Sequence, residues 1–324
     1  MTTVPIARAL NQGLRDAMDA DDKVLLIGED IGRLGGVFRV TDGLQKDFGE
    51  QRVVDSPLGE AGIVGSAIGL AMAGYRPVCE IQFDGFVFPA MNQIVTQLAK
   101  YRHRSEGQIT LPVVIRIPVG GGIGAIEHHS ESPEAYFAHT AGLKVMSPSS
   151  AQEAYDQIGL AIRSDDPVIF LEPKRSYWLK GEVDTAATPT PADKAKIVRA
   201  GDDLTLVVWG ALVPVALKVA EVCAEEGRSI EVIDMRSLSP IDDATLLASL
   251  ERTGRLVVAH EASRTAGVGA EIAARMQQQA FYSLEAPILR VTGYDTPYPA
   301  SRLEEDWLPG LDRILDAVDQ SFDQ

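Results

Sequence analysis

Short apolar runs alternate with helix-like segments along nearly the whole chain, and this alternation limits the fold more than any other feature. Four apolar runs of strand length stand at residues 24–27, 78–83, 113–117 and 168–171. Helical patterns fill residues 4–18, 60–73, 87–104 and 149–163, with Thr3 predicted to cap the first helix. Strands that are apolar throughout are buried on both faces, so the pattern predicts a mainly parallel sheet covered by helices.

The alternation lapses once, between residues 180 and 196, where prolines, threonines and small residues gather. It then resumes with strands predicted at 204–209, 230–235, 256–259 and 288–291 and helices at 211–226, 241–252, 269–281 and 309–321. Ser239 to Asp242 resembles a helix-capping sequence at the start of the second of these helices. We therefore predict two α/β domains, residues 1–185 and 199–324, joined by a linker at 186–198.

Charge and cysteine content exclude several classes of protein. The 324 residues include 46 acidic and 30 basic ones, a net charge of −16, which argues against binding to nucleic acids or anionic membranes. Cys79 and Cys223 are too few for a disulfide framework and suit a reducing compartment. The N-terminus does not resemble a signal peptide, and no window of 18 residues is apolar and uncharged. We expect a cytoplasmic protein.

Common catalytic motifs are missing from the sequence. It contains neither a Gly-Lys pair for a phosphate-binding P-loop nor a Gly-x-Ser-x-Gly nucleophile motif. Residues Gly120–Gly124 follow a predicted strand, and they fit a ligand-binding loop and a tight turn equally well. The spacing of His128, His129 and His139 does not match a usual metal site, so we predict no metal ligands and favour proton transfer. The chain is therefore either a binding module or an enzyme that uses a cofactor.

A glycine-rich helix carries the first candidate residue, Glu60. Small residues Gly62, Gly65, Ser66 and Gly69 recur at spacings of three and four, although glycine costs about 1 kcal/mol in a helix interior. This spacing indicates that a helix, a subunit or a cofactor approaches the backbone closely. Glu60 lies in the first turn, where the helix dipole favours a carboxylate, so a functional role and a helix-start role are equally compatible with the pattern.

Further candidates follow predicted strands. Gln82 and Phe86 come at the carboxyl end of a strand, where open α/β sheets place their ligands. Phe86 suits stacking on an aromatic ring or ordinary core packing. His129 follows the glycine-rich turn and is a candidate for proton transfer.

Several stretches in both predicted domains together resemble the beta chain of the decarboxylase component of 2-oxo acid dehydrogenase complexes. The matching stretches are Asp55–Glu60, Arg76–Glu80, His129–Ser132, Asp166–Lys174, Ile233–Pro240 and Asp295–Pro299. Their order and spacing make the resemblance specific. It implies a transketolase-like fold of two doubly wound domains, the first binding the aminopyrimidine ring of thiamine diphosphate. It also implies that Glu60 activates this cofactor by sharing a proton with the ring, that Gln82 and Phe86 line the ring, and that His129 faces the substrate and the lipoyl group.

The resemblance also implies partners. The family's diphosphate and Mg²⁺ motif begins with Gly-Asp-Gly, which is absent here and belongs to an alpha subunit. The active site would then lie between subunits of an α2β2 heterotetramer, and this chain would be active only with its alpha partner. Family members can also bind a structural monovalent cation such as K⁺, which would fall near Val113 and Asp166. The acidic run Glu304, Glu305 and Asp306 suits docking of the lipoyl acyltransferase core or a solvated surface.

Substrate class is the least determined property. Residues Gln82–Phe83 and Ser132–His139 are more similar to the branched-chain enzymes than to the pyruvate enzymes, so we favour branched-chain 2-oxo acids. One pocket methylene is worth about 1–3 kcal/mol, so the two classes overlap. Glu131 replaces a glutamine that often follows His-Ser in the family, which bears on substrate choice. A pyruvate dehydrogenase beta subunit and a non-catalytic assembly subunit are the alternatives.

Overall fold

The computed structural model describes residues 1–323. The first domain is built on a seven-stranded sheet. The strand order is β12-β6-β7-β5-β4-β2-β3. The strands are β2 (Val24–Gly28), β3 (Val53–Asp55), β4 (Arg76–Glu80), β5 (Val114–Val119), β6 (Lys144–Met146), β7 (Val168–Pro173) and β12 (Ser237–Ser239). All neighbours pair in parallel except β12 and β6, which run antiparallel. Strand β12 comes from the chain of the second domain, so the two domains share this sheet.

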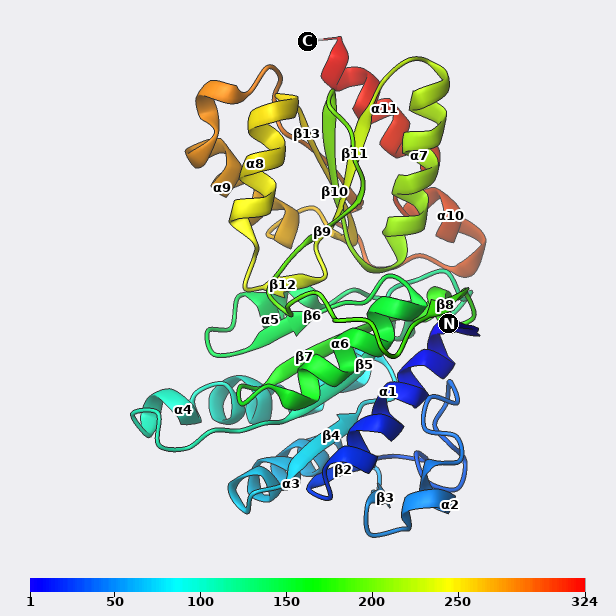
Figure 1. The fold of residues 1–324 in the computed structure, drawn as a ribbon, viewed down its shortest axis with the longest axis vertical. Coiled ribbons are helices and arrows are strands. Elements are labelled where there is room, and N and C mark those ends of the chain that lie inside the picture. Colours follow the sequence, from blue (N-terminus) through cyan, green and yellow to red (C-terminus); the bar gives the residue numbers. More distant parts are fainter. Residues whose placement is uncertain (324) are drawn as a thin grey trace.

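Helices cover both faces of this sheet (Figure 1). The longer ones are α1 (Ile6–Ala20), α3 (Glu60–Met72) and α6 (Ala151–Arg163). Shorter ones are α2 (Leu44–Phe48), α4 (Tyr101–Arg104), α5 (Glu134–Ala138), the 3₁₀ segments η1 (Asp84–Ala90), η3 (Glu127–His129) and η4 (Lys174–Ser176), and the π-helical segment η2 (Asn92–Leu98). Along β2, Val24 and Leu26 pack towards α1 and α6, whereas Leu25 and Ile27 pack towards α3. Because helices cover both faces of the sheet, its central strands are mostly apolar. The buried charged exceptions, Glu80 in β4, Arg116 in β5 and Glu172 in β7, pair with one another.

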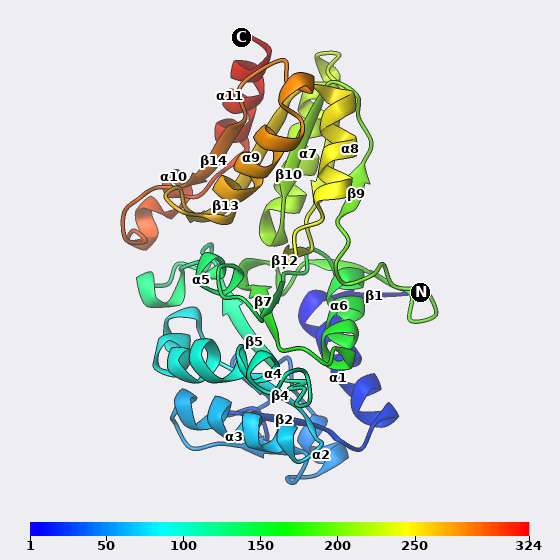
Figure 2. The same ribbon diagram turned by 90° about the vertical axis from the view of Figure 1, so that its left-hand side faces the viewer.

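The second domain holds a five-stranded sheet in the order β14-β13-β10-β11-β9. Its strands are β9 (Lys196–Arg199), β10 (Leu204–Val208), β11 (Ile230–Asp234), β13 (Leu256–Ser263) and β14 (Leu289–Gly293), of which only β9 pairs antiparallel. Its helices are α7 (Val213–Glu225), α8 (Asp243–Thr253), α9 (Val268–Gln279), α10 (Glu304–Trp307) and α11 (Leu311–Phe322), with 3₁₀ segments η5 (Gly210–Leu212), η6 (Phe281–Ser283) and η7 (Ser301–Leu303). Helices α8 and α9 cover one face, and α7 and α11 the other (Figures 1 and 2). Both domains are therefore α/β layers of the predicted kind.

The two domains share one hydrophobic core. Residues from the α3 face of the first sheet, such as Ile117 and Leu171, belong to the same buried cluster as Trp209, Met235 and Val258 of the second domain. The chain between the domains starts with β8 (Lys180–Val183), which pairs antiparallel with the N-terminal strand β1 (Thr2–Pro5). Docking of the domains is therefore built from apolar packing as well as from the shared strand β12.

Several local predictions were wrong. Thr3 lies in β1 and does not cap the first helix, which begins only at Ile6. The segment predicted as one helix over 87–104 is broken into η1, η2 and α4, and Pro89 lies inside η1. Asp242, rather than Ser239, caps α8 by accepting a hydrogen bond from the backbone N–H of Thr245. Residues 196–198 of the predicted linker 186–198 lie in β9.

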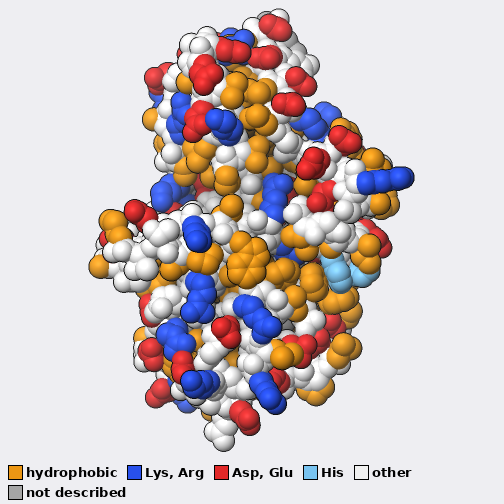
Figure 3. Space-filling view, turned by 90° about the vertical axis from the view of Figure 1, so that its right-hand side faces the viewer, with side chains coloured by type: hydrophobic (Ala, Val, Ile, Leu, Met, Phe, Trp, Pro, Cys, Tyr) orange, Lys and Arg blue, Asp and Glu red, His pale blue; other side chains and the backbone are white. Residues whose placement is uncertain are grey.

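Acidic and basic side chains are interspersed over both domains on the face drawn in Figure 3, and hydrophobic side chains reach the surface between them. Within residues 1–323, every helix is too short or too polar to cross a membrane.

Candidate functional site

The candidate site lies at the carboxyl edge of the first sheet. Strands β2, β3, β4 and β5 run parallel, so the loops that follow them meet at one edge. These loops carry Glu29, Glu60, Gln82 and His129, which come from four separate parts of the sequence. The topology therefore explains why residues up to 100 positions apart belong to one surface.

Glu60 is the first residue of α3, and its side chain is half-buried beside a second carboxylate, Glu29. The Glu29 carboxylate accepts a hydrogen bond from the backbone N–H of Gly59 at 3.1 Å, directly before Glu60. Burial raises the pKa of Glu29; the Gly59 N–H lowers it again, and the charges of Glu60 and Asp30 raise it further. Two acidic side chains thus face the start of this helix, and the sequence analysis identified only one of them.

Gln82 connects the β4 loop to the β2 loop. Its amide nitrogen lies 3.4 Å from the backbone oxygen of Glu29 and 3.3 Å from a carboxylate oxygen of Asp30. Asp30 adopts a left-handed conformation with φ of 58°, which turns the chain at the end of β2. Gln82 and the two acidic residues are therefore neighbours at the edge of the sheet.

An aromatic cluster joins Phe83 and Phe86 to His129. The His129 ring stacks on Phe83 with centroids 4.0 Å apart and an interplanar angle of 22°. Phe86 meets His129 edge-on at 5.1 Å and Phe83 edge-on at 6.0 Å. The structure thus brings His129 and Phe86 together, and Phe83 was the member that sequence reasoning missed. His139, at the end of α5, is outside this cluster.

The glycine-rich turn is a docking element of the two domains. The N–H of Gly121 donates to Glu261 at 3.2 Å, that of Gly122 to the Tyr298 hydroxyl at 3.3 Å, and that of Gly124 to Glu304 at 3.3 Å. These three partners come from the second domain. Of the two interpretations of this turn, the structure supports the tight turn, with φ of 81°, 88° and 72° at Gly120, Gly122 and Gly124. The N–H groups of Gly121, Gly122 and Gly124 are thus occupied by protein side chains, and that of Gly120 by the backbone oxygen of Glu131.

Glu304 is therefore not part of an exposed acidic run. Its side chain is buried and also accepts a hydrogen bond from the Tyr298 hydroxyl at 2.7 Å. Of the two interpretations of this run, docking of the acyltransferase core and a solvated surface, neither fits Glu304, because its carboxylate is used inside the chain. Glu305 and Asp306 are exposed.

The glycine-rich face of α3 lies open. Among the described residues, nothing comes within 4 Å of the position that a Cβ would take at Gly62 or Gly69. Ser66 is exposed on the same helix. Large apolar side chains that flank the site in sequence are exposed as well: Leu58, Phe88, Ile126 and Tyr136. At Gly65 the Gln93 side chain would lie 3.6 Å from an added Cβ, whereas at Gly62 and Gly69 the close approach that the glycines predict is not made within residues 1–323.

Within residues 1–323, no group of three or more His, Cys, Asp and Glu side chains is placed to hold a metal ion. Asp166, near the predicted cation position, pairs with Arg102 and lies 3.3 Å from the Lys144 ammonium. Both cysteines are free and buried, as expected for small apolar residues.

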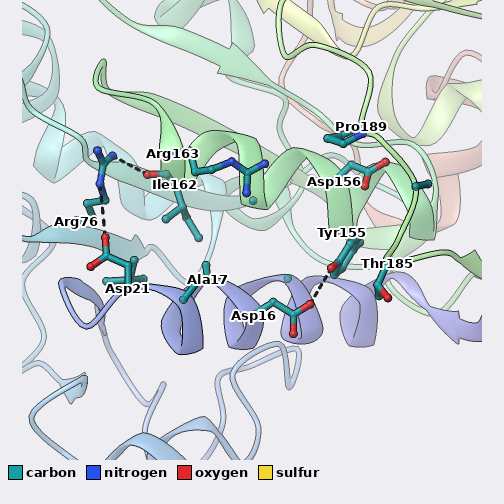
Figure 4. Close-up of a pocket in the computed structure, with 15 residues that line it drawn as sticks. Asp16, Ala17, Asp21, Arg76, Tyr155, Asp156, Ile162, Arg163, Thr185 and Pro189 are labelled. Carbon is teal, nitrogen blue, oxygen red and sulfur yellow. Dashed lines mark hydrogen bonds and ion pairs between the residues drawn. The ribbon is translucent and has the colours of Figure 1, made fainter.

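A cavity of about 660 Å³ lies on the opposite side of the first sheet, between α1, α6 and residues 185–189 (Figure 4). Two pairs of its polar groups contact each other: Tyr155 donates to Asp16 at 2.7 Å, and Arg76 lies 3.8 Å from Asp21. This cavity is separate from the candidate site, because Glu60 belongs to α3, which packs on the other face of the sheet.

The carboxyl edge offers a carboxylate, an amide and aromatic rings on one half-buried surface. This set of groups suits a flat heteroaromatic ring with polar edge atoms: the carboxylate can hold a proton on a ring nitrogen, and the aromatic rings can cover its face. The imidazole of His129, at the border of the same surface and with its centroid 4.3 Å from that of the His128 ring, can donate or accept a proton.

Comparison with known proteins agrees with this architecture. Residues 2–178 match the transketolase pyrimidine-binding domain, and residues 193–314 match the transketolase C-terminal domain. A split-gene transketolase, described as an inactive beta4 tetramer, superposes with a TM-score of 0.83 over 99% of this chain and 98% of its own, at 21% identity. At that identity, the likeness concerns the fold alone, and it confirms the transketolase-like prediction.

Curated relatives are more specific. The chain is 62% identical to a pyruvate dehydrogenase E1 component subunit beta of Leifsonia xyli, over 99% of this chain and 95% of the relative. It is 52% identical to a 3-methyl-2-oxobutanoate dehydrogenase subunit beta of Mycobacterium tuberculosis, over 99% and 93%. It is 44% identical to a 2-oxoisovalerate dehydrogenase subunit beta of Pseudomonas aeruginosa, over 97% and 93%. The chain therefore belongs to the family of 2-oxo acid dehydrogenase beta subunits, in which a transketolase pyrimidine-binding domain precedes a transketolase C-terminal domain.

Proposed function

We propose that this chain, together with an alpha subunit, forms a thiamine diphosphate-dependent dehydrogenase of branched-chain 2-oxo acids, which passes the acyl group to the lipoyl group of an acyltransferase. The observation that carries this proposal is the placement of Glu60. Its half-buried carboxylate begins α3 at the sheet edge that also carries Gln82, Phe86 and His129. A solvated helix-start glutamate would need none of these neighbours.

Each residue has a distinct role in this proposal. Glu60 holds a proton at the pyrimidine ring of the cofactor, and the buried Glu29 lies beside it, where its carboxylate accepts a hydrogen bond from the N–H of Gly59 and its pKa is raised by burial. The Gln82 amide and the Phe86 ring line the pyrimidine. When bound, thiamine diphosphate supplies the carbon nucleophile and the electron sink that decarboxylation of a 2-oxo acid needs. His129, at the border of the site, donates a proton during acyl transfer.

The alpha subunit would supply what this chain lacks. The sequence has no Gly-Asp-Gly motif, so we assign the diphosphate and its Mg²⁺ to the partner, in an α2β2 heterotetramer. The open glycine face of α3 and the exposed Leu58, Phe88 and Ile126 support a partner surface here, because monomeric proteins rarely leave large apolar patches uncovered. A K⁺ ion held by main-chain oxygens near Val113 and Asp166 and a surface that docks the acyltransferase core remain predictions.

Pyruvate is the second candidate substrate. The segments Gln82–Phe83 and Ser132–His139 favour branched-chain substrates, whereas the relative that is 62% identical is named a pyruvate dehydrogenase subunit. A non-catalytic assembly subunit is the third candidate. The presence of Glu60 argues against a non-catalytic subunit, because a site that performs no reaction has no need of a carboxylate at this position.

The test is to coexpress this chain with its alpha partner and to measure thiamine-dependent decarboxylation of pyruvate and of branched-chain 2-oxo acids. Glu60→Gln should lower turnover by about 100-fold or more while the heterotetramer stays assembled, because acid–base groups contribute about 10²–10⁴ in rate. The matched control is Glu305→Gln, at an exposed glutamate, which should turn over normally.

Near-normal turnover by Glu60→Gln would contradict the assignment of this residue. The isolated chain should bind thiamine diphosphate weakly, because the diphosphate site lies on the partner. Tight Mg²⁺-dependent binding by this chain alone would contradict the shared site.

A further inference from the structure

A buried ion pair lies directly behind the aromatic cluster. The Lys174 ammonium, at the start of η4 directly after β7, contacts the Asp84 carboxylate at the start of η1, and both side chains are at most 1% exposed. Lys174 also donates to the backbone oxygen of Pro118 at 3.3 Å and lies 5.9 Å from the centroid of the Phe83 ring. Burying two charges is costly unless further hydrogen bonds satisfy them, so this pair needs an explanation beyond stability.

The second oxygen of Asp84 supplies that explanation. It accepts a hydrogen bond from the backbone N–H of Glu131 at 2.9 Å, two residues after His129. The backbone oxygen of Glu131 in turn accepts from the N–H of Gly120 at 2.9 Å. Residues 120–131 therefore form a loop that is closed at its base, and Asp84 fixes this base to the sheet.

Packing leaves the loop little freedom at the point where it carries His129. A Cβ at Gly85 would collide with the backbone of His128, so the loop lies directly on the chain that follows Asp84. His129 stacks on Phe83, which is the residue before Asp84. One short stretch, residues 83–85, thus supports the imidazole ring, the loop backbone and the base of the loop.

We propose that Asp84 and Lys174 are positioning residues that hold His129 on Phe83 in the geometry needed for transfer of the acyl group to the lipoyl acceptor. The role in acyl transfer rests on the proposed function, whereas the positioning of His129 by the loop does not. Lys174 fixes the orientation of the Asp84 carboxylate, Asp84 fixes the Glu131 backbone, and the closed loop then presents His129. Glu60 lies on α3, and the Gln82 amide is held by Glu29 and Asp30 of the β2 loop, so we expect decarboxylation to depend less on this pair than acyl transfer does.

The first test separates two partial reactions of the assembled enzyme. The variants are Asp84→Asn and the double variant Asp84→Asn with Lys174→Met, which leaves no uncompensated buried charge. Decarboxylation is measured with an artificial oxidant, and acyl transfer with a free lipoyl domain. Transfer should fall by about 10- to 100-fold, the loss that a misplaced group causes, while decarboxylation changes by less than about threefold.

The matched control is Glu153→Gln, which breaks a buried pair with Arg236 at the domain boundary, away from His129. It should lower the melting temperature without changing the ratio of the two reactions. If the two reactions fall together in the Asp84 variants, in step with melting temperature, the pair is merely structural and the proposal is wrong.

The second test needs no activity. Diethyl pyrocarbonate modification of each histidine, followed by mass spectrometry, reports how well His129 is held. In Asp84→Asn, His129 should react about threefold faster relative to the exposed His103, while the buried His260 stays protected. An unchanged His129, or a His260 that becomes reactive at the same time, would overturn the positioning role. If the wild-type enzyme neither decarboxylates nor transfers, the proposed function fails, and this second test still decides on the positioning of His129.

Discussion

A carboxylic acid buried between the two domains should make this protein less stable as pH rises. Glu134, in the first turn of α5, is 2% exposed and lines a small cavity with Trp209, Arg175 and Glu261. Burial is the main reason why the pKa of Glu134 rises from the ordinary 4.5 to about 8. The charge of Glu261 also raises this pKa, whereas hydrogen bonds from its own backbone N–H and from the Trp209 side chain lower it. The folded state therefore keeps a proton on Glu134 at neutral pH, where the unfolded chain has lost it.

The sign and size of the effect follow from this difference. Below pH 4.5, both states carry the proton, and the free energy of unfolding does not depend on this group. Between pH 4.5 and about 8 only the folded state binds it, so stability falls as pH rises, and the full penalty is present above pH 8. At about 1.4 kcal/mol per unit, the shift sets an upper limit of about 5 kcal/mol. Water entering the adjacent cavity would reduce the penalty, so we expect about 2–5 kcal/mol.

The perturbation is Glu134→Gln, which keeps the shape of the neutral acid and cannot ionise. Urea unfolding of wild type and variant at pH 5 and pH 9 gives the two free energies of unfolding. The variant should match wild type at pH 5 and exceed it by about 2–5 kcal/mol at pH 9. The exposed Glu305→Gln serves as control and should follow wild type at both values. Parallel pH profiles of wild type and Glu134→Gln, or a variant that is less stable at pH 9, would refute the reasoning.

Three further predictions concern stability, assembly and reactivity. Arg116→Met leaves the buried Glu80 and Glu172 without their cation and should cost about 3–5 kcal/mol in urea unfolding, whereas Arg102→Met, at a half-exposed pair, should cost under about 1 kcal/mol. Gly62→Ala should stabilise the isolated chain by about 1 kcal/mol, because the added Cβ meets nothing within 4 Å, yet weaken assembly in sedimentation experiments if the partner covers this face. Burial raises the pKa of Cys79 to about 12, so its thiol should resist alkylation at pH 8 until the protein unfolds, and labelling of native protein would contradict this.

The sequence allowed good prediction of the central strands and the long helices. Strands such as β2 and β10 are almost entirely apolar because helices bury both of their faces, and this composition is visible in a single sequence. Edge elements were missed. Strand β12 has only three residues, and it exists because it pairs with β6 of the other domain, so its local sequence carries little signal.

Some residues of the candidate site could likewise be predicted from the sequence, and others could be found only in the tertiary structure. Glu60 could be found because a glycine-rich helix follows it, and Gln82 because it follows a predicted strand and matches the family resemblance. Glu29 and Phe83 also stand at strand ends, but nothing in the local sequence distinguishes them from ordinary residues there. Only tertiary structure places the Glu29 carboxylate against Gly59 and the Phe83 ring under His129.

The sequence by itself determined the layer architecture, the transketolase-like resemblance and the identity of the principal candidate residues, because periodicity and motif spacing are local properties of a chain. Tertiary structure decided the roles of Gly120–Gly124 and Glu304. In sequence, Gly120–Gly124 fitted a ligand loop or a tight turn, and Glu304 belonged to an acidic run. In the fold, the Glu304 carboxylate accepts a hydrogen bond from the N–H of Gly124. These hydrogen-bond partners are 180 positions apart, and they meet only because the two domains dock. A local sequence pattern therefore cannot predict the pairing.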